Sequence, residues 1–145
     1  MLDRFLITDD RKTTILIRMM VGLVFLSEGL QKFLFPVLRG AGRFDAIGLP
    51  SPEFLSYFVG TFEVLCGLFI LLGFLTRFAA FPLIVIMIVA LSTTKFKILV
   101  EQGFWDMMHA ARTDFSMLLG SIFLLIRGGG RWSLDRLFWR LRTGI

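Results

Sequence analysis

Four long apolar stretches, separated by short polar segments, dominate the sequence of this 145-residue chain. They extend over about residues 14–35, 54–74, 77–95 and 106–126. Because about 20 mainly apolar residues cross the hydrocarbon layer of a bilayer, each stretch is long enough for a transmembrane helix. The pattern therefore predicts an all-α integral membrane four-helix bundle, forming a single domain over residues 1–145.

The fourth stretch is the least uniform of the set. Residues 115–126 are apolar throughout but too short to cross a bilayer alone. The helix is therefore predicted to begin near Asp106, with His109, Arg112 and Asp114 in its first turns, and to end at the glycines that begin at Gly128.

Two shorter helices are predicted outside the spans. Residues 43–49, in the loop rich in Gly and Pro that follows the first span, form a short helix at the membrane interface. The tail over residues 133–142 is a short basic amphipathic helix, since Leu134, Leu137, Phe138 and Leu141 share one face while Arg136 and Arg140 share the other.

The distribution of basic residues predicts the orientation. Two groups face opposite sides: ten residues lie at the termini and in the second turn (Arg4, Arg11, Lys12, Arg18, Arg77, Arg127, Arg131, Arg136, Arg140 and Arg142), and six lie on the other side (Lys32, Arg39, Arg43, Lys95, Lys97 and Arg112). Since cytoplasmic segments carry the excess of Lys and Arg, both termini are predicted to be cytoplasmic. The net charge of +5 is then explained by anionic lipid headgroups, and no nucleic-acid partner is expected.

The scarcity of cysteine and histidine excludes several chemistries. Cys66 is the only cysteine, so an intrachain disulfide, a CxxC redox pair and a thiolate metal cluster are excluded within one chain. His109 is the only histidine, which excludes a haem held by two histidines of one chain. No metal site and no tightly bound cofactor are expected, and no catalytic residue is assigned.

Three ionisable residues, Glu28, Lys32 and Glu63, fall inside the first two spans. A charged side chain at the centre of a membrane helix costs about 2.5–3.5 kcal/mol, so such residues have partners and often a function. Glu28 and Lys32 are spaced i, i+4, the favourable order for an ion pair, and Gln31 shares their face. Lys32 and Glu63 approach each other if the first two helices are neighbours.

Most polar groups of the spans fall in their outer halves, which predicts a polar pocket open to the outside. Its candidate residues are Glu28, Gln31, Lys32, Glu63, Lys95, His109, Arg112 and Asp114. The alternative is structural: a buried ion pair that only fixes packing, together with ordinary interfacial helix ends. Glycines recurring seven residues apart, Gly22 and Gly29, then Gly60 and Gly67, are predicted to let helices approach closely.

These residues together resemble the DoxX family of small four-span bacterial membrane proteins. The resemblance rests on an ordered set of positions: Arg18, Gly22, Phe25, Gly29, Lys32 and Phe33; then Phe44, Gly48, Pro50, Gly60, Glu63, Gly67, Gly73, Thr76 and Arg77; and finally Gly128, Gly130, Ser133 and Asp135. It implies a multi-pass protein of the bacterial inner membrane. Some members of the family are linked to quinone-dependent oxidation of sulfur compounds, and others associate with proteins that handle oxidative stress.

Three functions fit this set of observations. The first is a membrane component of a redox system, meeting a quinone or a redox partner protein at the pocket, without being an enzyme on its own. The second is a small transporter or channel for a solute or protons, and the third is a scaffold or chaperone without a ligand. The lipid bilayer is the expected partner in each, and both a monomer and an oligomer are compatible with the pattern.

Overall fold

The structure, a computed structural model, describes residues 11–143 and is helical, with no strand in that range. Arg4, counted in the charge balance, lies outside the described residues. The elements in chain order are α2 (Thr14–Leu34), α3 (Ala41–Ile47), α4 (Pro52–Leu72), α5 (Thr76–Ala90), the π-helical turn η1 (Leu91–Lys95), α6 (Phe96–Gln102), α7 (Phe104–Arg127) and α8 (Leu134–Thr143).

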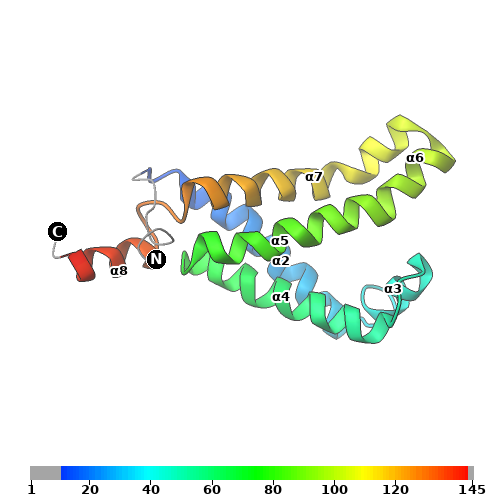
Figure 1. The fold of residues 1–145 in the computed structure, drawn as a ribbon, viewed down its shortest axis with the longest axis horizontal. Helices are drawn as coiled ribbons and strands as arrows, with labels where there is room; N and C mark the ends of the chain where they lie inside the picture. The colour runs from blue at the N-terminus through cyan, green and yellow to red at the C-terminus, as the bar shows by residue number, and fades with distance from the viewer. Residues whose placement is uncertain (1–10, 144–145) are drawn as a thin grey trace.

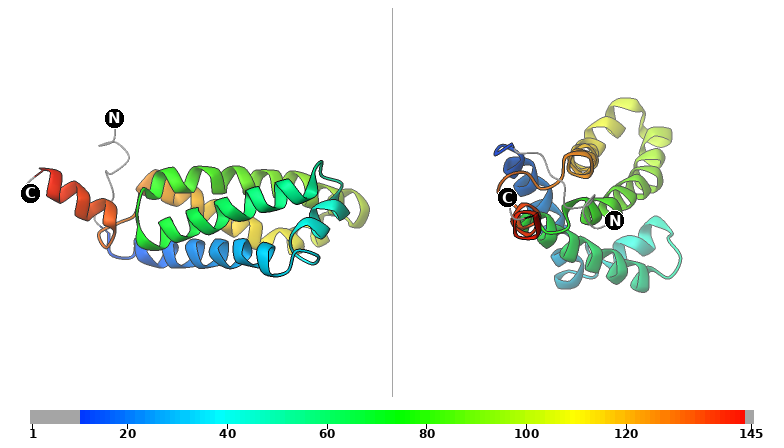
Figure 2. Two further views of the ribbon diagram at one scale, coloured as in Figure 1. Left: turned by 90° about the horizontal axis from the view of Figure 1, so that it is seen from below. Right: turned by 60° about the vertical axis from the view of Figure 1, so that its left-hand side comes forward.

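The four longest helices form one antiparallel bundle (Figure 1). α2 packs against α4 and α7, and α5 packs against the same two helices. α3 and α6 both lie at one end of the bundle, called the α3/α6 end below. α8 and the start of α2 lie at the other end, called the α8 end (Figure 2).

Three helices are long and apolar enough to cross a membrane: α2, α4 and the continuous helix Thr76–Gln102, which consists of α5, η1 and α6. α7 is also long, with 24 residues, but it is not one of the three. Its first half carries Asp106, Arg112 and Asp114, which lower its mean hydropathy. The protein is therefore an all-helical membrane protein whose fourth predicted span is the most polar.

The third helix is longer than predicted from the sequence. Its expected end was Lys95, but the chain continues through the π-turn η1 into α6 and ends at Gln102. Residues 96–102 remain helical, and the helix ends at Gly103, whose φ is +96°. Lys95 Nζ lies 3.0 Å from Asp114 Oδ2 of α7, so this charged residue is paired within the bundle. At 1.5 Å per residue the 27 residues span about 40 Å, more than the hydrocarbon layer of about 30 Å.

The predicted role of the glycines is confirmed at the contact between α2 and α4. A Cβ atom at Gly29 would lie 2.8 Å from the backbone oxygen of Gly60, and one at Gly67 would lie 3.0 Å from that of Gly22. The two glycine pairs therefore let the helix backbones touch, as small residues do in membrane bundles. This close contact fixes how the side chains of α2 and α4 meet.

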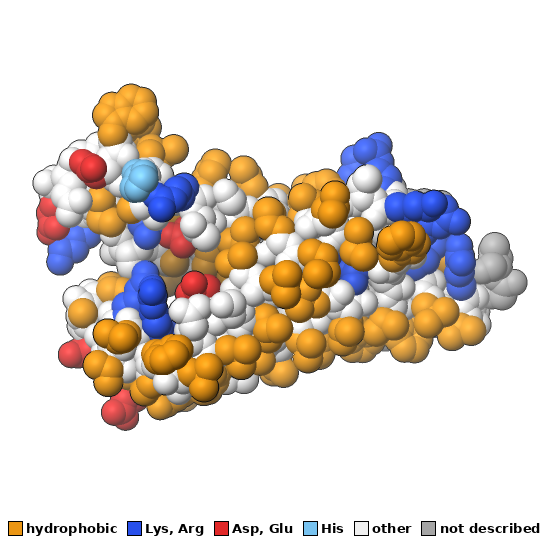
Figure 3. All heavy atoms as spheres, turned by 180° about the vertical axis from the view of Figure 1, so that it is seen from behind, with side chains coloured by type: hydrophobic (Ala, Val, Ile, Leu, Met, Phe, Trp, Pro, Cys, Tyr) orange, Lys and Arg blue, Asp and Glu red, His pale blue; other side chains and the backbone are white. Residues whose placement is uncertain are grey.

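A layer of apolar side chains lies inside the bundle, and the outer surface of the bundle is apolar as well. Val21, Ile70, Leu83 and Leu124 are fully buried, one from each of the four long helices. Many large hydrophobic side chains are exposed around the bundle, and Figure 3 shows them covering its flank between charged ends. An apolar flank of this kind is suited to lipid.

Arg18 holds the α8 end together. Its buried guanidinium donates hydrogen bonds to the carbonyl oxygens of Ile70 and Leu71, at the end of α4, and of Gly129 and Trp132, in the segment before α8. The last carbonyls of a helix have no partner within the helix, so Arg18 supplies one to Leu71 and adds a second hydrogen bond at Ile70, whose carbonyl already accepts from the Gly73 N–H.

Asp135, fully buried in the first turn of α8, binds the start of α5. Its carboxylate accepts hydrogen bonds from the backbone N–H groups of Leu75 and Thr76 and from the Thr76 hydroxyl, while its own N–H donates to the Gly73 carbonyl. Burial raises the pKa of Asp135, and the hydrogen bonds from Thr76 and Leu75 oppose that shift. Arg18 and Asp135 thus clamp the α4–α5 turn and α8 to the bundle.

Candidate functional site

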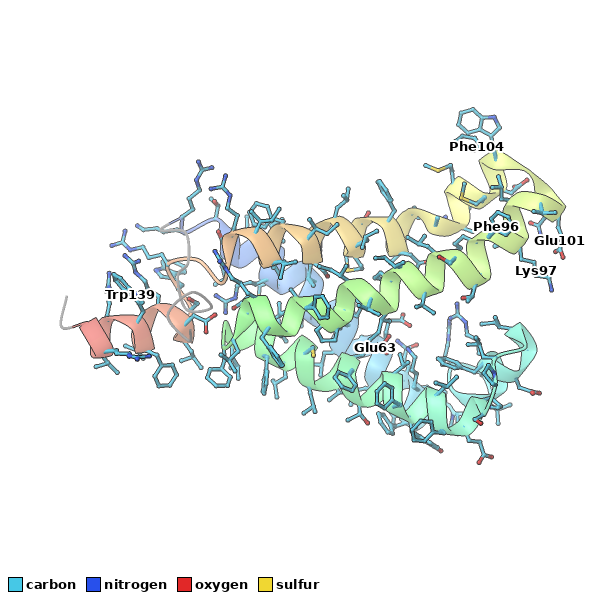
Figure 4. The ribbon with its side chains drawn as sticks, viewed as in Figure 1. Glu63, Phe96, Lys97, Glu101, Phe104 and Trp139 are labelled. Atoms are coloured by element: carbon cyan, nitrogen blue, oxygen red, sulfur yellow. The ribbon has the colours of Figure 1, made fainter. Side chains whose placement is uncertain are left out.

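A buried ion pair joins the first two long helices. Lys32 Nζ, in the last turn of α2, lies 2.5 Å from Glu63 Oε2, near the middle of α4. The side chains are only 10% and 4% exposed. Figure 4 shows Glu63 midway along α4, inside the bundle. The approach of these two residues is confirmed, and it follows from the glycine contact that brings α2 against α4.

The predicted ion pair between Glu28 and Lys32 is not formed. Lys32 Nζ instead lies 3.4 Å from the backbone oxygen of Glu28, one turn earlier in the helix. Lys32 turns toward α4 because the carboxylate of Glu63 is buried there and has no other salt-bridge partner among residues 11–143. Glu28 remains half-buried.

A pocket of about 460 Å³ opens beside the ion pair, between the α2–α3–α4 part of the bundle and the pair α5–α7. Figure 3 shows a hollow at the α3/α6 end with acidic and basic side chains around it. Most of the wall is apolar: it includes Val24, Phe25, Leu55, Phe58, Val59, Val85, Ile86, Met87, Val89, Ala90 and Met117. Pockets of this size and character are typical of small-molecule sites.

The charged part of the lining is balanced and comes from four helices and the loop after α2. Three carboxylates (Glu28, Glu63 and Asp114) and three cations (Lys32, Arg39 and Arg43) line the pocket. Glu63 and Asp114 are each paired, with Lys32 and Lys95 respectively. Glu28 and Arg43 are the other charged groups that act electrostatically on Glu63.

The structure brings part of the predicted site together. Glu28, Lys32, Glu63 and Asp114 line the pocket, and Lys95 contacts Asp114 without lining it. Three predicted residues (Gln31, His109 and Arg112) do not line it.

Helical phase explains these three exceptions. Gln31 donates to the Ser27 hydroxyl on its own helix, away from Lys32. On α7 the inward stripe runs through Ala111, Asp114 and Met117, so His109 and Arg112 fall on the exposed side, where Arg112 Nη1 donates to the His109 carbonyl.

Two lining residues, Arg39 and Arg43, were not predicted as part of the site. They lie in the loop after α2 and in α3, and from the sequence they contribute only to the charge balance. The sequence does predict a short helix at residues 43–49, and the structure has one at Ala41–Ile47. A helix at this place brings basic side chains over the α3/α6 end of the bundle, which could have pointed to these two arginines.

The pocket offers hydrogen-bond donors and proton-exchanging groups. Within residues 11–143, no group of three or more His, Cys, Asp or Glu side chains could hold a metal ion. An ammonium, two guanidiniums and three carboxylates beside an apolar wall can hold the polar end of a lipophilic molecule and exchange protons with it.

The family model of DoxX matches residues 13–96, more than half of the chain. This chain belongs to the DoxX family. The matched region contains α2, α3, α4 and α5, and therefore both members of the buried ion pair.

Two relatives support the assignment. "Uncharacterized membrane protein Rv3486" of Mycobacterium tuberculosis is 52% identical over 139 residues, covering 92% of this chain and 85% of the relative. CatD of Bacillus subtilis, whose name carries a provisional oxidoreductase assignment, is 32% identical over 123 residues, covering 84% of each chain. No solved structure matches the chain.

Proposed function

We propose that this protein is the membrane component of a redox system and binds a quinone in the pocket beside Lys32 and Glu63. The observation that carries the proposal is a buried ion pair next to a largely apolar pocket, between two helices that are long and apolar enough to span a membrane. The provisional oxidoreductase name of CatD supports the redox setting.

The proposal includes four crossings of a bacterial inner membrane, with the α8 end in the cytoplasm. α7 packs along α5 and also contacts α2, both of which are apolar enough to span, so it is expected to cross with them. The excess of basic residues at the α8 end supports a cytoplasmic location for that end. The pocket then opens toward the periplasm.

A reporter fused after Ile145 should show a cytoplasmic C-terminus. The reason is the ten-to-six excess of Lys and Arg on that side, since basic segments are retained in the cytoplasm. Paired fusions of alkaline phosphatase and a fluorescent protein make the measurement, with a second fusion in the loop before α4 as the opposite-side control. Phosphatase activity from the intact C-terminal fusion would reverse the orientation and place the pocket opening in the cytoplasm.

A quinone fits the chemistry of the pocket. Its ring and tail are apolar and match the wall, while its carbonyl oxygens accept hydrogen bonds of the kind that Lys32 can donate. Bonds from a charged donor are stronger than neutral ones and strengthen further as the ring gains negative charge on reduction. Glu63 holds the ammonium in place, 2.5 Å from its oxygen.

Purified protein should bind a short-chain ubiquinone, and Lys32→Met should weaken binding by about ten- to a hundredfold, the effect of losing one charged donor. Lys97→Met is the matched control, because Lys97 is exposed and does not line the pocket. The charge-free variant Lys32→Met/Glu63→Met removes the donor without leaving a buried charge, so it should also lose binding while remaining folded. Quinone affinity that is unchanged in both Lys32 variants would refute this site.

The transporter alternative gives a different result in proteoliposomes. Fully buried Val21, Ile70, Leu83 and Leu124 fill the bundle between the pocket and the α8 end, so no solute flux is expected. Saturable uptake that Glu63→Gln abolishes, in protein that binds no quinone, would assign transport instead.

A further inference from the structure

A second pocket, separate from the quinone site, lies at the α8 end. It has a volume of about 330 Å³ and is formed by the last turn of α4, the segment before α8 and α8 itself. Three arginines line it, Arg131, Arg136 and Arg140, together with Leu72, Trp132, Ser133, Leu134 and Leu137. Among residues 11–143, none that lines it is acidic.

The fold positions this pocket, because α8 is not a loose tail. Asp135 ties the first turn of α8 to the start of α5, and Arg18 binds the carbonyl oxygen of Trp132. The rings of Phe74 and Phe138 also meet at 6.0 Å, between the α4–α5 turn and α8. The arginines of α8 are therefore presented at a fixed place beside α4.

The charges of the pocket favour an anion. Arg136 and Arg140 are one helical turn apart, and Arg136 lies over the Trp139 ring at 5.2 Å from its centroid. Asp135, the nearest acidic residue in sequence, is buried and bound to α5. Guanidinium groups bind phosphate oxygens in bidentate fashion, so three of them around one pocket match a phosphate.

The apolar part of the lining distinguishes a lipid from a soluble anion. Leu72, Trp132 and Leu137 are 48%, 60% and 50% exposed, and Leu72 is the last residue of α4. Trp favours the interface between hydrocarbon and headgroups. Arginines beside exposed apolar residues at the end of a membrane helix match a headgroup with its first acyl carbons.

We infer that this pocket is a binding site for the phosphate headgroup of an anionic phospholipid. It is independent of the quinone proposal, because the two pockets share no residue and lie at opposite ends of the bundle. General attraction between a basic surface and an anionic bilayer would depend only on net charge, whereas this site depends on particular arginines.

The test uses the full chain in neutral detergent, titrated with dihexanoyl phosphatidylglycerol and separately with dihexanoyl phosphatidylcholine. Tryptophan fluorescence reports binding, since Trp132 lines the pocket and Trp139 is next to Arg140. Phosphatidylglycerol should bind more tightly. Arg131→Gln/Arg140→Gln should weaken it about thirtyfold, and Arg140→Gln alone about fivefold, from the usual effect of one arginine near a lipid headgroup.

The matched control is Lys97→Gln/Arg112→Gln, which removes the same net charge from exposed residues at the α3/α6 end and should leave the affinity unchanged. An equal loss in the control would show that only net charge matters, and equal binding of the two lipids would show that the phosphate charge is not selected. Displacement of the lipid by inorganic phosphate at similar concentration would assign a soluble anion. Each of these three results would overturn the inference.

Discussion

Glu63→Gln and Glu63→Ala should lower the melting temperature of the detergent-solubilised protein by similar, large amounts. Either change leaves Lys32 as a buried ammonium without its partner, and breaking a buried ion pair from one side costs about 3–5 kcal/mol. If Glu63 were protonated and only hydrogen-bonded, Gln would be tolerated much better than Ala. The 2.5 Å contact with Lys32 Nζ favours the ion pair and therefore similar losses.

The charge-free variant Lys32→Met/Glu63→Met completes this experiment. Apolar residues of similar volume often replace a buried ion pair without loss of stability, so the double variant should recover most of the melting temperature. The exposed pair Lys97–Glu101, at 3.9 Å, is the matched control: Glu101→Gln should change stability by less than about 1 kcal/mol. Small and equal losses for all the single variants would mean that the pair does not stabilise the bundle.

The sequence predicts the long helices well because their signal is local. α2 and α4 begin and end within about two residues of the predicted limits, since apolar length and flanking Gly or Pro residues mark them. The meeting of Lys32 and Glu63 is also accessible from the sequence, because elements that follow one another along the chain are usually neighbours in space. The family resemblance pointed to the same fold.

The remaining features depend on contacts between distant residues, which no local pattern contains. Lys95 resembles the end of a span, yet it pairs with Asp114 of another helix and the chain stays helical to Gln102. The depth of His109 and Arg112 along the predicted span is the only basis for expecting them in the pocket. In the structure the rotation of α7 turns both side chains outward. The depth of a residue in the membrane can be estimated from the sequence. Which side of a helix faces inward depends on the helices that pack against it.

Arg18 is the clearest case of a residue whose role the sequence did not reveal. From the sequence, Arg18 is a positive charge that flanks the first span and a position shared with the family. In the structure it is 3% exposed, and its acceptors lie 52 to 114 residues further along the chain. A flanking arginine and a buried clamp look identical in sequence, because the difference lies in backbone carbonyls that every residue has.

This geometry predicts that Arg18→Lys will not preserve the structure, although it keeps the charge. A guanidinium presents five N–H donors in a planar fork, whereas an ammonium presents three from a single atom and cannot reach carbonyls on both α4 and the segment before α8. Since hydrogen bonds from charged donors contribute about 1.5–3 kcal/mol each, losing two of the four should destabilise the protein by about 3 kcal/mol or more. The melting temperature in detergent measures this loss.

Limited proteolysis tells which part of the molecule loosens. Because Arg18 binds the segment that leads into α8, Arg18→Lys should speed tryptic cleavage within α8, for example after Arg140, before the bundle is cut. Arg112→Lys is the matched control: Arg112 Nη1 also donates to a carbonyl, that of His109, but its hydrogen bond is exposed and the change should have little effect. If Arg18→Lys melted and was cleaved like the unmodified chain, Asp135 alone would suffice to hold α8, and the pocket of arginines beside α4 would owe its fixed position to that single carboxylate.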